Sequence, residues 1–136
     1  MDRGKAVLGV VAGLVVWIAV VAVAGVIMRA SWPAYASVAD AMTFTLPMML
    51  ARLTIGALAT LAAGWVTTAI SPRSMLVRLL PGVLLLVGFI PQHIALWNTF
   101  PVWYHLTFLL SLVPLTYLGG MLISGRQNRA LPASHL

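Results

Sequence analysis

Arg52 is the residue whose type and position point most directly to chemistry. It interrupts an otherwise apolar run over residues 46–70, where a helix would place it about 9 Å from the N-terminal end. Arg52, Gly56 and Thr60 follow one another at four-residue spacing, so they share one helix face. A charge in such a helix often marks a binding site, but an arginine near a helix end can also extend to lipid headgroups. Both interpretations stay open.

Carboxylate partners for Arg52 are scarce, because Asp2 and Asp40 are the only acidic residues. Asp2 precedes the chain's first apolar run, so it is expected on the opposite side of the bilayer from Arg52. In a continuous helix Asp40 would be about 18 Å from Arg52. An aspartate just before a helix is more typically its N-cap. The candidate partners are therefore neutral side chains near the hairpin between the last two apolar runs. They are Gln92, His93, Asn98, Tyr104 and His105.

This cluster could bind a lipid headgroup or a small anion through charge-assisted hydrogen bonds. His93 and His105 alone do not predict a metal or haem site, because they flank one short loop and no H-x-x-x-H or H-E-x-x-H pair accompanies them. The chain has no cysteine, no G-x-S-x-G motif and no paired carboxylates. We therefore predict no catalytic residue, no metal and no cofactor.

Composition identifies the elements that must position these residues. The chain has 136 residues, of which 62% are hydrophobic and 7% are charged, against about 25% charged in soluble domains. Four apolar runs are each long enough to cross a bilayer as a helix, which takes about 20 residues. They cover residues 6–28, 46–70, 75–96 and 100–123, and a polar tail follows at 125–136. The sequence predicts an all-α membrane protein, a single-domain bundle of four transmembrane helices.

Positive charges predict the orientation of the bundle. Six basic residues fall on one side and only Arg29 on the other, so both termini are expected in the cytoplasm. The six are Arg3, Lys5, Arg73, Arg78, Arg126 and Arg129. Aromatic residues mark the opposite side, where an interfacial belt is expected. These are Trp32, Tyr35, Trp97, Phe100, Trp103 and Tyr104.

Small residues predict how the helices pack, since membrane helices approach closely where side chains are small. Gly9 and Gly13 are four residues apart in the first run, and Gly56, Thr60 and Gly64 belong to a longer stripe in the second. The second helix is therefore expected at the centre of the bundle. Pro91, inside the third run, frees a backbone carbonyl, so we expect it to face protein.

Three segments resemble those of small, uncharacterised four-span inner-membrane proteins of Gram-negative bacteria. The first is Ala51-Arg52-Leu53-x-x-Gly56, the second is Phe89-Ile90-Pro91-x-His93, and the third is residues 100–105, Phe-Pro-Val-Trp-Tyr-His. The resemblance implies an architecture and a bacterial inner membrane, but no reaction.

Three functions remain open on the sequence alone. The leading one is a non-enzymatic accessory or scaffold element whose outward-facing cluster binds a headgroup or anion. The second is a small transporter or channel that acts as a homo-oligomer, and the third is a redox subunit that holds haem or quinone. The bilayer is the expected partner, with a second copy or another membrane protein as further candidates and no nucleic acid.

Overall fold

The computed structural model describes residues 2–71 and 74–130, and every regular element in these ranges is a helix. The chain forms α1 (Arg3–Ser31), α2 (Pro33–Val38), α3 (Leu46–Ile70), α4 (Met75–Ala95) and α5 (Val102–Ala130). All but α2 are long and apolar enough to cross a membrane. The prediction of an all-helical chain with four long apolar helices is confirmed.

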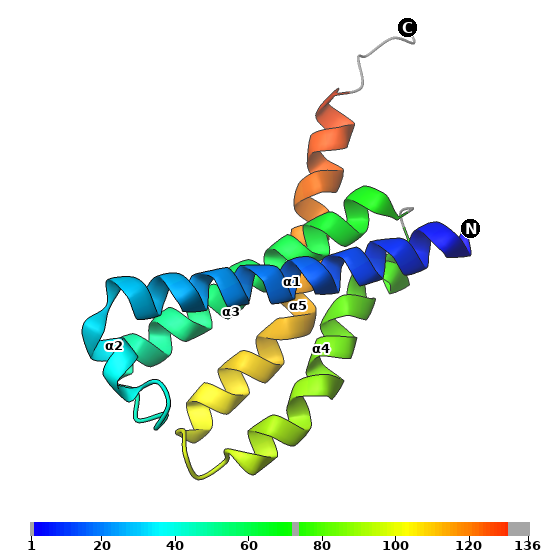
Figure 1. Ribbon diagram of the computed structural model, residues 1–136. Helices are drawn as coiled ribbons and strands as arrows, with labels where there is room; N and C mark the ends of the chain where they lie inside the picture. Colours follow the sequence, from blue (N-terminus) through cyan, green and yellow to red (C-terminus); the bar gives the residue numbers. More distant parts are fainter. Residues whose placement is uncertain (1, 72–73, 131–136) are drawn as a thin grey trace, which may run out of the picture.

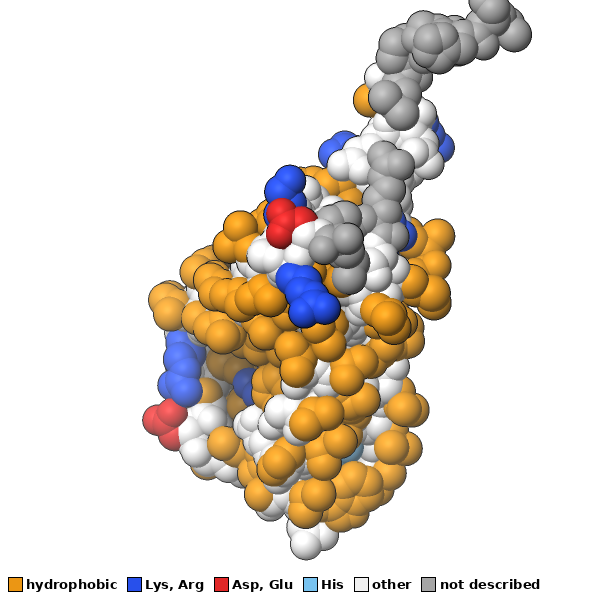
Figure 2. All heavy atoms as spheres, turned by 90° about the vertical axis from the view of Figure 1, so that its right-hand side faces the viewer, with side chains coloured by type: hydrophobic (Ala, Val, Ile, Leu, Met, Phe, Trp, Pro, Cys, Tyr) orange, Lys and Arg blue, Asp and Glu red, His pale blue; other side chains and the backbone are white. Residues whose placement is uncertain are grey.

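The four long helices alternate in direction, which gives the molecule two ends (Figure 1). At the loop end, residues 32–45 join α1 to α3 and residues 96–101 join α4 to α5. At the terminal end lie the first turn of α1 and the last turns of α5 (Figure 1). Figure 2 shows hydrophobic side chains over most of the surface between the two ends, with the charged side chains gathered near them.

The helix bounds differ from the expected spans mainly at the ends. α3 occupies the same residues as the second expected span, while α1 extends beyond its span on both sides. α5 continues as an exposed helix through Ala130, across part of the expected polar tail. Arginine, glutamine and alanine in this stretch favour helix even without packing. Residues 131–136 of that tail lie outside the described part of the chain.

α3 lies between α1 and α5 and packs against both. A Cβ at Gly9 would lie 2.9 Å from the Thr67 carbonyl oxygen, and one at Gly13 would lie 2.8 Å from that of Ala63. On the other side of α3, a Cβ at Gly64 would overlap the Thr116 backbone of α5. These contacts require glycine because the helix backbones touch directly.

Two buried threonine hydroxyls on α3 also depend on glycine. Thr67 and Thr68 have no hydrogen-bond partner among the described residues. Their Oγ1 atoms occupy the space that a Cβ would take at Gly13 of α1 and Gly120 of α5, respectively. A larger side chain at either glycine would displace the hydroxyl, so these threonines and glycines set the distance between the helices together.

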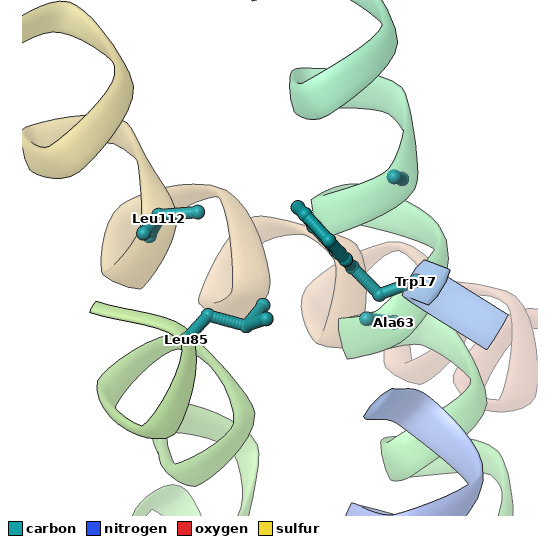
Figure 3. Close-up of a cluster of buried hydrophobic side chains, with 5 residues drawn as sticks. Trp17, Ala63, Leu85 and Leu112 are labelled. Carbon is teal, nitrogen blue, oxygen red and sulfur yellow. The ribbon is translucent and has the colours of Figure 1, made fainter. Parts of the chain in front are cut away.

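The main hydrophobic core lies halfway along the bundle. Trp17 of α1 points past Ala63 of α3 towards Leu85 of α4 and Leu112 of α5 (Figure 3). Its indole Nε1–H donates to the Thr60 hydroxyl at 3.1 Å, so the ring is held by a hydrogen bond as well as by packing. This layer closes the bundle between its two ends.

Pro91 is exposed, so the expectation that it faces protein is wrong. Phe89 and His93, four residues apart, both turn towards the bundle and contact Phe108. A residue midway between them lies on the opposite face of α4. The proline ring is itself apolar, and α4 continues through it to Ala95.

Candidate functional site

A cavity of about 280 Å³ lies at the loop end of the bundle. α1 and α4 diverge towards this end (Figure 1), and both contribute lining residues, together with α3 and α5. Figure 2 shows a recess on this side of the molecule with a Lys or Arg side chain inside it. The lining is mostly apolar, and its polar members are Tyr35, Arg52, Gln92, His93 and Tyr104.

Arg52 is held in the cavity wall by three aromatic residues. Its Nη1 donates to the Tyr35 hydroxyl at 2.8 Å, and its Nε donates to the Tyr104 hydroxyl at 3.3 Å. The guanidinium carbon lies 4.6 Å from the centre of the Phe44 ring, in a cation–π arrangement. The side chain is thus fixed within the bundle by contacts from the α2 segment, meaning residues 32–45 between α1 and α3, and from α5.

These contacts leave hydrogen-bond donors unused. A guanidinium carries five N–H groups, and Arg52 places two of them on acceptors in the described residues. Because Tyr35 and Tyr104 each accept from Arg52, their own O–H groups remain able to donate. Two tyrosine hydroxyls and the rest of the guanidinium are therefore available as donors among the residues that line the cavity.

Neither acidic residue of the chain balances Arg52. Asp2 caps the first turn of α1 at the terminal end, where its carboxylate accepts from the Gly4 and Lys5 amides. Asp40 pairs with Arg29 at 3.0 Å on the surface, so it is neither the N-cap of α3, a position held by Thr45, nor a partner of Arg52. A positive charge thus faces the cavity without a carboxylate beside it.

A stack of aromatic rings crosses the loop end and supports the cavity there. The rings follow one another from the start of α2 to the start of α5, with centroids 4.9 to 6.0 Å apart. In order they are Trp32, Tyr35, Phe44, Phe100 and Tyr104. This aromatic stack places both tyrosine hydroxyls within reach of Arg52.

Another group of rings closes the cavity towards the terminal end. The ring centroids of Trp17 and Phe89 are 5.1 Å apart, and those of Phe89 and Phe108 are also 5.1 Å apart. All three residues line the cavity and also pack on the main hydrophobic core. The cavity is therefore confined to the loop-end half of the bundle.

The two histidines contact each other at the edge of this site. The Nδ1 atoms of His93 and His105 are 2.7 Å apart, and the His105 Nε2 lies 3.3 Å from the Trp97 carbonyl oxygen. His105 is completely buried, and its ring stacks on that of Trp97. His93 stacks on Phe108 and lines the cavity. Within the described residues, no group of three potential metal ligands occurs.

The cluster expected from the sequence comes together in part. Arg52, Gln92, His93 and Tyr104 line one cavity, and His105 supports it from behind. Asn98 is exposed in the α4–α5 loop and does not line it. The residues expected to pack helices, Gly9, Gly13, Gly56, Thr60 and Gly64, all lie at contacts between helices.

Tyr35, Phe44 and Trp17 belong to the site but were not among the candidates. Tyr35, Phe100 and Tyr104 were assigned to an interfacial aromatic belt, yet each is less than 10% exposed. Trp97 and Trp103 are more than 40% exposed, as residues of such a belt would be. Their aromatic type was the available signal, but it does not separate rings buried in a stack from rings at a membrane surface.

Comparisons of the chain with protein-family models, with curated proteins and with solved structures find no match.

Proposed function

We propose that this chain is a non-enzymatic, four-span membrane protein that binds an anionic amphiphile in the loop-end cavity. The observation that carries the proposal is Arg52, fixed by two tyrosines with donors left over and no carboxylate nearby, in a mostly apolar cavity. A partly buried charge needs a counter-charge. The described residues supply no counter-charge at this place, so an anionic ligand would provide it.

The charges favour one placement in the membrane. Arg3, Lys5, Arg78, Arg126 and Arg129 belong to the terminal end, while Arg29 belongs to the loop end. The positive-inside rule then puts both termini in the cytoplasm and the cavity in the outer half of the bilayer. The resemblance to four-span proteins of Gram-negative bacteria supports the inner membrane as its location.

A lipid fits this cavity better than a free anion does. Besides the polar residues, the cavity is lined by aliphatic side chains from three helices, Val21 and Met28 of α1, Ile55 of α3 and Leu96 at the end of α4. An inorganic anion would leave this surface uncovered. A lipid can place its charged head at Arg52 and its first methylene groups against the aliphatic residues.

The packed layer beneath the cavity favours binding over conduction by a single chain. An ion crossing the bundle would have to pass Trp17, Leu85 and Leu112, which belong to the main hydrophobic core. The histidine pair also gives little support to a haem site, because His93 and His105 are bonded to each other rather than placed on two sides of a plane. We therefore assign the cavity to a lipid that the protein holds, presents or senses as an accessory element.

Two glycines allow a matched test of this proposal. A Cβ at Gly25, which lines the cavity, or at Gly88, which does not, would meet no atom within 4 Å. Gly25→Leu should fill the cavity without disturbing helix packing, whereas Gly88→Leu adds the same side chain outside it. Binding of phosphatidylglycerol to the purified protein, measured by native mass spectrometry, should fall about tenfold or more in Gly25→Leu only. Equal binding by both variants and the wild type would refute the site.

A further inference from the structure

The bonds of the histidine pair determine where its hydrogens lie. A carbonyl oxygen only accepts, so the contact between the His105 Nε2 and the Trp97 carbonyl requires a hydrogen on that nitrogen. In a neutral His105, Nδ1 then carries the lone pair. The 2.7 Å contact between the two Nδ1 atoms needs one hydrogen, which must come from His93.

The Nε2 of a neutral His93 is therefore an acceptor. It makes no hydrogen bond within the described residues, and His93 lines the same cavity as Arg52, Tyr35 and Tyr104. The contact between His105 and the Trp97 carbonyl thus determines the tautomer of a residue in the cavity, as the second hydrogen bond of an imidazole generally does. The cavity thus offers several donors, the Gln92 amide, which can donate or accept, and an acceptor of fixed tautomer at His93.

We propose, building on the lipid-binding function above, that the cavity selects a lipid phosphomonoester. Such a head carries negatively charged oxygens for Arg52 and the tyrosines, and its remaining P–OH group can donate to the His93 Nε2. A phosphomonoester loses its second proton near pH 6. The lone pair on the His93 Nε2 favours the form that keeps this proton, because a second phosphate charge would otherwise face that lone pair.

Other anionic heads satisfy only part of this pattern. A phosphodiester has no P–OH group at neutral pH, so one of its charged oxygens would face the His93 lone pair. A carboxylate likewise lacks a hydrogen to donate, and a protonated carboxylic acid has lost the charge that Arg52 requires. Free inorganic phosphate has the right head, but it leaves the aliphatic lining of Val21, Ile55 and Leu96 uncovered.

The test compares phosphatidic acid, a monoester, with phosphatidylglycerol, a diester, both with the same acyl chains. Native mass spectrometry of the full-length protein in detergent gives the affinity ratio. The wild type should prefer phosphatidic acid by about tenfold, the size expected for one hydrogen bond to a charged group. Inorganic phosphate in excess should not displace the lipid. Displacement would identify a free-phosphate site and overturn the lipid assignment.

Two variants remove the acceptor. His93→Phe keeps a ring stacked on Phe108 but leaves the buried His105 Nδ1 without its donor, so it carries a risk to folding. His93→Asn retains an amide N–H for His105 while lacking Nε2. Both should bind the two lipids with a ratio near one. Ile94→Asn, one position along on the exposed face of α4, should keep the wild-type ratio.

The outcomes separate the two proposals. A wild-type ratio near one, or a preference that survives in His93→Asn, overturns the monoester assignment while lipid binding stands. Loss of all lipid binding in wild type overturns both. The histidine tautomers, measured by ¹⁵N NMR on the ligand-free protein, are an independent readout. They should show a protonated Nδ1 for His93 and a protonated Nε2 for His105, and the opposite tautomers would overturn the inference.

Discussion

Replacing Arg52 by lysine separates a fixed site residue from an anchor at the membrane surface. The guanidinium reaches two acceptors at once, with Nη1 on Tyr35 and Nε on Tyr104, and it also lies over the Phe44 ring. A lysine ammonium is a single point at the end of a flexible chain, so it cannot occupy both positions. If Arg52 only extended to headgroups, any long cation would do.

The magnitude follows from the contacts. Hydrogen bonds to a charged group contribute about 1.5–3 kcal/mol each, and the lower figure applies here because the side chain is only partly buried. Arg52→Ala loses both bonds, about 3 kcal/mol together, and also the ring contact, so the free energy of unfolding should fall by at least about 3 kcal/mol. Arg52→Lys keeps at most one bond, and a loss of about 1.5 kcal/mol is expected.

Reversible unfolding in mixed detergent micelles, followed by circular dichroism, measures both losses. Tyr35→Phe and Tyr104→Phe, alone and combined with Arg52→Lys, complete double-mutant cycles that isolate each hydrogen bond. Loss of the hydroxyl that still bonds to lysine should cost the same in both backgrounds, so its coupling energy should be near zero. The other tyrosine should show a coupling energy about the size of the hydrogen bond that Arg52→Lys removes. If Arg52→Lys is as stable as the wild type while Arg52→Ala is not, Arg52 is a surface anchor and the site argument fails.

The packing and the orientation give two more predictions. Gly64→Leu should lower the free energy of unfolding by about 3 kcal/mol or prevent folding, because its side chain would overlap the Thr116 backbone. Gly88→Leu should be neutral. Equal stability of the two variants in the same detergent assay would contradict a central position of α3 in the bundle. Reporter fusions after Gln127 and within residues 33–38 should report cytoplasm and exterior, and reversed signals would place the cavity in the inner half of the bilayer.

The elements of the fold could be predicted from the sequence because their signals are local. A long apolar run predicts a long helix by its length alone, even where one charge interrupts it, and α3 begins and ends where its run does. Glycine spacing on α1 and α3 likewise depends on one helix at a time. The pairing of Gly64 with Thr116 is not local, since nothing in the spacing of α3 indicates which helix lies opposite.

The site depends on side chains brought together from distant segments, so the sequence indicated only part of it. Arg52 was recognisable because a charge in an apolar run is costly wherever it lies. Its partner Tyr35 comes from a six-residue helix outside the four expected spans. Asp40 was eliminated as a partner by distance along a helix, but its bond to Arg29 depends on how the α2 segment folds back towards the end of α1.

The same dependence explains why the sequence did not predict that the two histidines bond to each other. Twelve positions separate His93 from His105, a spacing that matches no metal motif, and their pairing follows only from the tight turn between α4 and α5. Once paired, they are linked to a backbone carbonyl that sets the direction of every hydrogen in the chain of bonds. A cavity with a fixed cation on one wall and a fixed acceptor on another distinguishes ligands by the placement of a proton as well as by charge. For this reason the ratio of monoester to diester binding tests the site more sharply than total affinity for anionic lipid does.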